Sequence, residues 1–298
     1  MKKALMMATA VALLLTSCGK KTLSPATADE TGKIQTIELN DHARLYVYNS
    51  GDAMYDASFI VEGIDSLVLM ETPLFKDADA EFEAFVGKIG KPVAAVITDY
   101  HEGGQAGVKN ILAEGFPAFI EGPVYGGMMA HFQEVWGEQL VTLPNLEGAE
   151  EVAWGETKTI DGIPFRFEHG ASSDFPAASI IIANKAYLTH WAPVQMHISP
   201  LQVSSREAID AEIEQAEAEL NSGCDVFVGS HCGVSSKEAV EWKLAYLKTL
   251  RDELGKCATA DEWMAAVEAA YPGLQGEDNL KALAAIFYAT PAQEAAAE

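Results

Sequence analysis

Histidine is the residue type that most directly indicates chemistry in this sequence. Four of the seven histidines follow or end segments that have the pattern of strands, namely His101, His169, His190 and His231. Ligands gather at strand ends in α/β proteins, because the loops there are exposed while their roots are rigid. One histidine in such a place is more often structural than a ligand. Four with the same placement indicate one shared metal or acid–base site.

The segment around His101 carries further groups of this kind. It reads Thr98-Asp99-Tyr100-His101-Glu102-Gly103-Gly104. Asp99 can coordinate a metal, or it can accept a backbone N–H at the start of a loop, which is a common use of aspartate. Glu102 can carry protons. No G-x-S-x-G nucleophile motif and no G-x-x-x-x-G-K-[ST] phosphate loop occurs, so neither of those chemistries is indicated.

The elements that must position these side chains follow from periodicity. Alternating or continuous apolar runs predict strands at residues 34–39, 43–48, 58–62, 66–70, 92–98, 118–121, 157–160, 164–169, 179–183, 186–190 and 225–230. Helical spacing predicts helices at 77–89 and 106–114, and a helix over the site is one interpretation of 124–136. Residues 122–129 are interpreted as a structural loop that packs on the core, with a mobile lid as the alternative. Capping boxes that begin at Ser204, Ser235 and Thr259 open three C-terminal helices, and residues 278–288 form the last helix. This order predicts a sandwich of two sheets covered by helices.

The ends of the chain have a different character. Residues 1–17 have a basic start, an uncharged apolar run and the sequence Leu15-Thr16-Ser17 before Cys18, which resembles a bacterial lipoprotein signal peptide. On that resemblance Cys18 is lipidated, and the protein is anchored in the cell envelope on the periplasmic or the outer-surface side. An ordinary secretory signal is the alternative. Residues 18–32 read as a flexible tether, 33–291 as one domain that includes the C-terminal helices, and 292–298 as a frayed tail.

Composition restricts the partners of this domain. The formal net charge is −24, from 20 Lys+Arg against 44 Asp+Glu. Nucleic acid is therefore not an expected partner, because its binding depends on basic residues that neutralise phosphates. The expected partners are a small-molecule substrate or ligand and, through Cys18, a membrane. Cys224, Cys232 and Cys257 can form one disulfide pair or can all remain thiols.

The order of elements resembles the metallo-β-lactamase-fold superfamily over roughly residues 40–255. In that family a buried strand leads into a T-H-x-H-x-D-H loop, and residues 98–104 stand in its place. Glu71-Thr72-Pro73 stands where the family has an Asp-Thr-Gly turn, Thr189-His190-Trp191 where it has Thr-Gly-Asp, and the turn around His231 where it has its last metal histidine. The resemblance implies a four-layer αββα sandwich of α+β class.

The resemblance also implies a ligand set. One metal ion would be held by Asp99, His101 and His169, a set that suits Zn²⁺ with an open position or non-haem Fe(II). The second zinc of the family loses its ligands here, because Gly103, Gly104 and Trp191 replace them and His231 alone is retained. Glu102 and His190 are the residues that could compensate.

Two functions follow. In the first, a metal-bound water attacks an ester, amide or phosphoester, and His231 or Glu102 serves as a proton relay. In the second, the fold has lost its metal, and the protein binds a ligand or partner without turnover. The sequence does not indicate a substrate.

The anchor generates the first testable prediction. Because the lipid on Cys18 would be the attachment to the membrane, Cys18→Ala is expected to move the protein from the membrane fraction to the soluble fraction. Fractionation followed by immunoblotting measures this. A variant that stays with the membranes after a high-salt wash would contradict the lipoprotein interpretation.

Overall fold

A computed structural model describes residues 27–29, 32–52, 54–170 and 178–289 of the chain. The expected signal peptide, Cys18, most of the tether and the C-terminal tail lie outside these residues. Within the described part, no helix is both long enough and apolar enough to cross a membrane.

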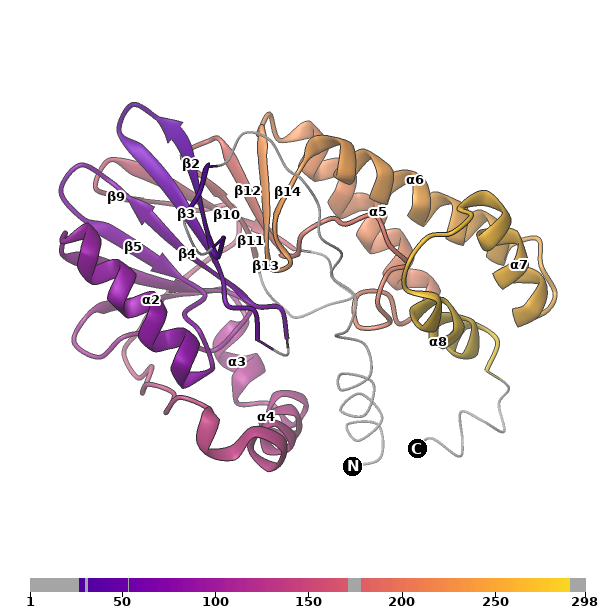
Figure 1. Cartoon of the computed structure of the whole chain (residues 1–298), viewed down its shortest axis with the longest axis horizontal. Coiled ribbons are helices and arrows are strands. Elements are labelled where there is room, and N and C mark those ends of the chain that lie inside the picture. The colour runs from indigo at the N-terminus through magenta and orange to yellow at the C-terminus, as the bar shows by residue number, and fades with distance from the viewer. Residues whose placement is uncertain (1–26, 30–31, 53, 171–177, 290–298) are drawn as a thin grey trace.

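Two β-sheets form the centre of the molecule (Figure 1). The first has eight strands in sequential order, namely β1 (Thr27–Ala28), β2 (Ile34–Asn40), β3 (Ala43–Asn49), β4 (Ala57–Glu62), β5 (Leu67–Met70), β6 (Val93–Thr98), β7 (Lys109–Ala113) and β8 (Glu150–Val152). The second has six strands in the order β14 (Gly233–Ser235), β13 (Val226–His231), β12 (Ala186–Trp191), β11 (Ala178–Ile182), β10 (Ile163–His169) and β9 (Thr157–Ile160). Strands β5 to β8 are parallel, as is the pair β12–β13, and the other pairs are antiparallel.

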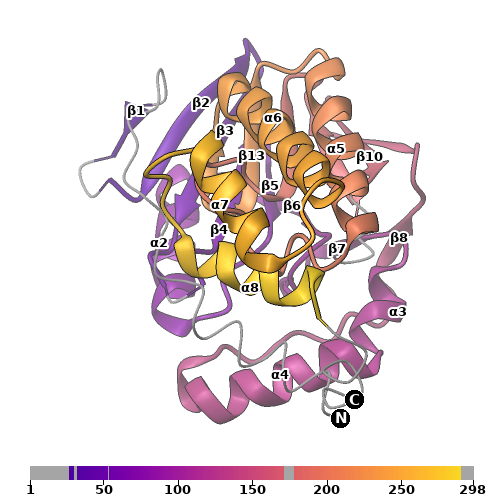
Figure 2. The same cartoon turned by 90° about the vertical axis from the view of Figure 1, so that its right-hand side faces the viewer.

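Helices cover the outer faces of both sheets. On the first sheet lie α2 (Lys76–Ile89), α3 (Phe116–Ile120), α4 (Pro123–Trp136) and the short 3-10 helix η1 (Gly137–Gln139). On the second lie α5 (Arg206–Asn221) and α6 (Lys237–Leu254), followed by α7 (Ala260–Ala270) and α8 (Glu277–Phe287), which face the viewer in Figure 2. The predicted four-layer αββα sandwich is therefore confirmed.

The core lies between the sheets, and side-chain alternation along each strand builds it. Phe59, Phe165 and Phe167 are fully buried between the two sheets. In β6, Ala95 and Ile97 join this inner cluster, while Val96 turns to the layer under α2. Val93 also faces the α2 layer, against the alternation expected for it, because the β5–β6 register shifts between Leu67 and Val68.

Two elements after β6 differ from the prediction. Residues 109–113 form a strand rather than a helix, because they extend the sheet in parallel register with β6. Residues 116–120 form a short helix rather than a strand, and Pro117 stands in its first turn, where the missing N–H costs nothing. Residues 123–136 form the helix α4, in agreement with the helical interpretation of 124–136, so that the part of 122–129 from residue 123 on is helix rather than loop.

The helix caps are shifted by one residue in two of three cases. Ser205 and Ser236, rather than Ser204 and Ser235, accept the N–H of the residue three positions on. Thr259 caps α7 as predicted. The described cysteines Cys224, Cys232 and Cys257 are free thiols.

The helical layer on the second sheet contains a buried carboxyl, Glu219 of α5. Burial raises its pKa to about 7, against the opposing effect of nearby Lys243. Below the ordinary pKa of 4.5 both the folded and the unfolded chain carry the proton. As the pH rises from there to 7, the unfolded chain ionises while the folded chain keeps its proton, so stability falls across this window.

Glu219→Gln removes this dependence. The free energy of unfolding of the variant relative to wild type is expected to rise by about 3 kcal/mol between pH 4 and pH 8, in proportion to the pKa shift. Urea denaturation at several pH values measures the change. Glu217→Gln, at an exposed position of the same helix, is the control. Parallel pH profiles for wild type and Glu219→Gln would contradict the prediction.

Candidate metal centre

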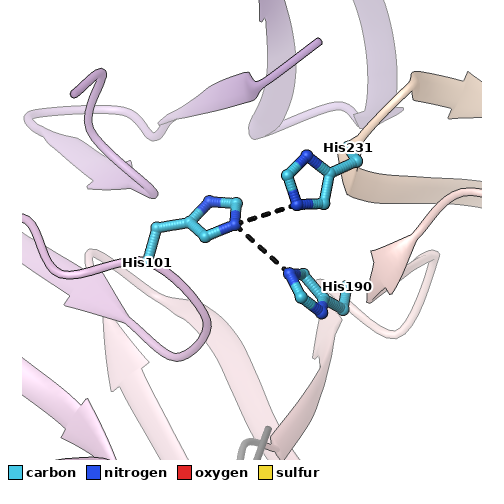
Figure 3. A group of neighbouring side chains, drawn as sticks. All are labelled: His101, His190 and His231. Carbon is cyan, nitrogen blue, oxygen red and sulfur yellow. Dashed lines mark hydrogen bonds between the residues drawn. The ribbon is translucent and has the colours of Figure 1, made fainter. Parts of the chain in front are cut away.

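Three histidine side chains converge at one edge of the two sheets (Figure 3). The Nε2 atom of His101 lies 3.2 Å from Nε2 of His231 and 3.2 Å from Nε2 of His190. His190 and His231 are buried, and the side chain of His101 keeps 19% of its exposure. These are the only three metal-binding groups in the described part of the chain whose ligand atoms lie within 4.8 Å of one another.

The sheets bring the three rings together from distant parts of the sequence. His101 follows β6 of the first sheet. His190 and His231 lie near the ends of β12 and β13, which are parallel neighbours in the second sheet. Stacking then orients the rings, since Tyr100 lies on His190 at 4.6 Å between centroids and Trp191 lies on His231 at 4.1 Å.

Glu71 holds the loop that carries His101. It is 2% exposed and follows β5 with a φ of 52°, a left-handed conformation that is uncommon outside glycine. Its Oε1 accepts the N–H groups of Asp99 and Tyr100 at 2.9 and 3.2 Å, and its Oε2 accepts the N–H of His101 at 2.9 Å. Burial alone would raise the pKa of Glu71, but these donors, Asp99 and His101 hold it below the ordinary value.

The outward nitrogens of two rings face carboxylates. Nδ1 of His101 lies 3.4 Å from Oε2 of Glu71. Nδ1 of His231 lies 3.0 Å from Oδ1 of Asp56 and 3.1 Å from the carbonyl oxygen of Met54. Carboxylates and carbonyls in this position fix the ring so that Nδ1 carries the proton and Nε2 presents a lone pair, which is the usual arrangement behind a metal-bound histidine.

This tautomer pattern creates an electrostatic requirement. If Nδ1 of His101 and of His231 donates outward, their Nε2 lone pairs point at each other across 3.2 Å. Only a positive charge between them, either a metal ion or a proton on Nε2 of His101, makes the arrangement favourable. The spacing suits a metal, because nitrogens at 2.0–2.1 Å from a tetrahedral zinc are about 3.3 Å apart.

The charge states of the neighbours agree with this. The pKa of His190 lies well below its ordinary value, because the ring is buried and lies beside His231 and His101. It is therefore a neutral ligand at pH 7. Burial raises the pKa of Asp56 to about 6, with His101 opposing the rise.

The expected ligands Asp99 and His169 lie outside this cluster. Asp99 is fully buried beside Glu71, and burial together with the charge of Glu71 raises its pKa well above the ordinary value. His169 is exposed at the end of β10, with its ring 3.9 Å from that of Trp154. Of the predicted set, the structure brings only His101 to the centre.

The two residues expected as proton relays are also placed differently. His231 stands in the cluster itself, as a potential ligand. Glu102 is half-buried and lies beside Tyr125 of α4, whose pKa is raised by burial and by the charge of Glu102. Glu71 and Asp56 are the supporting residues that the sequence analysis did not assign. For Glu71 a signal existed in its position at the turn after the strand, whereas Asp56 had none.

The loop has no room for further side chains at the two glycines after Glu102. A Cβ on Gly103 would lie 2.3 Å from Oγ1 of Thr72. Gly104 has a φ of 139°, and a Cβ there would lie 2.7 Å from Oδ1 of Asn110. A second metal site with ligands at these two positions is therefore sterically excluded in this backbone.

Comparison with known proteins identifies the fold. The sequence matches no protein-family model and no curated protein. The structure is similar to a metallo-beta-lactamase family protein from Thermus thermophilus, with a TM-score of 0.53, 15% identity and coverage of 81% of this chain and 90% of that one. It is similar to a metallo-beta-lactamase superfamily protein from Sulfolobus tokodaii, with a TM-score of 0.52, 14% identity and coverage of 80% and 97%.

A third similar structure is a stereoselective inverting sec-alkylsulfatase from Pseudomonas sp., with a TM-score of 0.52 and 17% identity. The match covers 94% of this chain but only 54% of the sulfatase, so the chain spans about half of that protein. At these identities the likeness concerns the fold alone. The chain has a metallo-β-lactamase fold, as the sequence resemblance implied.

The packing of Gly103 gives a testable prediction. Gly103→Ala is expected to lower the free energy of unfolding by about 1–3 kcal/mol, because the new methyl group overlaps Oγ1 of Thr72. Thr72→Ala in the same background should recover part of the loss, although alone it removes the acceptor of the Gly104 N–H. Denaturant unfolding of the four proteins in this double-mutant cycle measures the coupling. Additive effects would contradict the steric argument.

Proposed function

We propose that this protein is a hydrolase that works with a single metal ion, most simply Zn²⁺, bound by the Nε2 atoms of His101, His190 and His231. The observation that carries the proposal is the convergence of the three inward nitrogens. Nε2 of His101 lies 3.2 Å from Nε2 of each of the other two rings, all three lie within 4.8 Å of one another, and carboxylates stand behind two of the rings. This replaces the ligand set expected from the sequence. Fe(II) remains an alternative ion for an imidazole set.

The residues present fit such an ion. Three neutral imidazoles leave a fourth position open, as in catalytic zinc sites. A bound zinc ion supplies a water of lowered pKa, which can act as a nucleophile on an ester, amide or phosphoester. The groups of this protein that hold the rings are Glu71, which fixes the loop of His101, and the carbonyl of Met54, which accepts from Nδ1 of His231 beside the carboxylate of Asp56. The ring of Tyr100 covers one face of His190.

Several classes of ester are candidate substrates for such a hydrolase. One neighbour in fold is a sec-alkylsulfatase. A sulfate ester is therefore one substrate class worth testing beside carboxylic and phosphate esters. We also propose, from the sequence of residues 1–18 alone, that the enzyme acts in the cell envelope on a lipid anchor at Cys18.

Metal analysis of the purified protein tests the proposal. Wild type is expected to bind one equivalent of Zn²⁺ at neutral pH. His190→Ala and His101→Ala should reduce this to substoichiometric binding, because two imidazoles with two open positions hold zinc far more weakly. Mass spectrometry of the metal content after dialysis provides the measurement.

His169→Ala is the matched control, because His169 also ends a strand but lies outside the cluster. It should leave the zinc content unchanged. Loss of zinc in His169→Ala with retention in His190→Ala would restore the ligand set expected from the sequence. A wild-type protein that takes up no metal would leave the alternative of a binding protein without turnover.

A further inference from the structure

His190, the third proposed ligand, also needs a group that holds its ring in place from the side away from the metal. His101 and His231 each turn Nδ1 toward a carboxylate, Glu71 and Asp56 respectively. In Figure 3 the ring of His190 also turns one nitrogen toward the other two rings and one nitrogen away from them. A neutral imidazole that presents Nε2 to a metal carries its proton on Nδ1, and this proton needs an acceptor because His190 is only 4% exposed.

A small cavity beside His190 limits the choice of acceptor. Its polar lining comes from Thr189, Glu212, Gln215 and Lys243, besides the aromatic groups that stack on the site. The hydroxyl of Thr189 donates to the carbonyl of Trp191, and the amide of Gln215 donates to the hydroxyl of Tyr187. The oxygens of these two side chains are neutral acceptors, which are weaker than a carboxylate. Lys243 has only donors to offer. Glu212 is the one side chain of this wall with carboxylate acceptors.

Glu212 and Lys243 form a buried ion pair across the two covering helices. Oε2 of Glu212 on α5 lies 2.6 Å from Nζ of Lys243 on α6, and the side chains are 4% and 5% exposed. Two charges taken out of water are costly unless further contacts compensate. Replacing such a pair by apolar residues of similar volume is often neutral for stability, so stability alone does not explain its presence next to His190.

We propose that Glu212, charge-balanced by Lys243, is the positioning residue of His190 and completes the set of carboxylates behind the three rings. The inference rests on the proposed metal site. It assigns a function to the α5–α6 layer, which would otherwise only cover the second sheet. The ammonium group of Lys243 balances the charge of Glu212, so that the pair acts on the metal through His190.

The test uses double variants that leave no unpaired charge. Glu212→Leu/Lys243→Met removes the acceptor, and the affinity for Zn²⁺ is expected to fall by about 10–100-fold, the usual cost of losing such a partner. Glu212→Gln/Lys243→Met keeps an amide acceptor and should lose less. Competition with a chromophoric chelator at pH 7.5 measures the affinity, and the visible spectrum of the Co²⁺-loaded protein reports on the coordination.

The control pair lies on the same two helices. Lys248 and Glu217 are 2.8 Å apart and exposed, and Glu217→Leu/Lys248→Met should leave both readouts unchanged. If wild type binds Zn²⁺ and Glu212→Leu/Lys243→Met binds it equally well, the positioning role is wrong while the metal site stands. If that variant does not fold, Glu212→Ala/Lys243→Ala, which also removes the acceptor and both charges, decides, and an affinity equal to wild type overturns the inference. A wild type without zinc affinity refutes the metal site itself.

Discussion

The carboxylate of Glu71 is the group on which the geometry of the centre depends. It accepts three consecutive backbone N–H groups of the loop after β6, and it faces Nδ1 of the histidine that this loop carries. One buried side chain therefore fixes the path of the loop and also places a carboxylate beside Nδ1 of His101. Its own backbone has a positive φ, a conformation that costs free energy and persists where the surroundings enforce it. The same residue also affects Asp99, whose pKa is raised by burial and by the charge of Glu71, because two adjacent buried carboxyls do not both ionise easily.

Much of this architecture is readable from the sequence, because it depends on local pattern. The continuous apolar run that forms β6 and the alternating runs of the second sheet predict their strands, and His101 and His231 follow from their places at strand ends. The prediction for the segment after β6 is wrong because residues 109–113 are a short strand whose parallel neighbour decides its conformation. No local signal carries that information. Likewise, Asp56 reaches His231 only because the chain folds back across both sheets.

The sequence also does not show which of His169 and His190 lies at the candidate metal centre. Both end strands, and both are candidates from the sequence. The order of strands in the second sheet decides between them, because β12 lies beside β13 and its His231, whereas β12 and β11 both stand between β13 and β10. Periodicity identifies strands but does not order them. The family pattern points to His169, and the structure places an exposed aromatic contact with Trp154 there instead.

The tight packing of Gly103 and Gly104 restricts the substitutions that this loop can accept during evolution. A metal-binding side chain at either position overlaps a neighbour, Thr72 in one case and Asn110 in the other. Recruitment of a second ion would therefore need compensating changes in residues that have no part in coordination. Each single step on that route lowers stability before it brings any catalytic gain. Packing thus restricts substitution at these two glycines, so that change in the residues around the three histidines is more accessible than change within the loop.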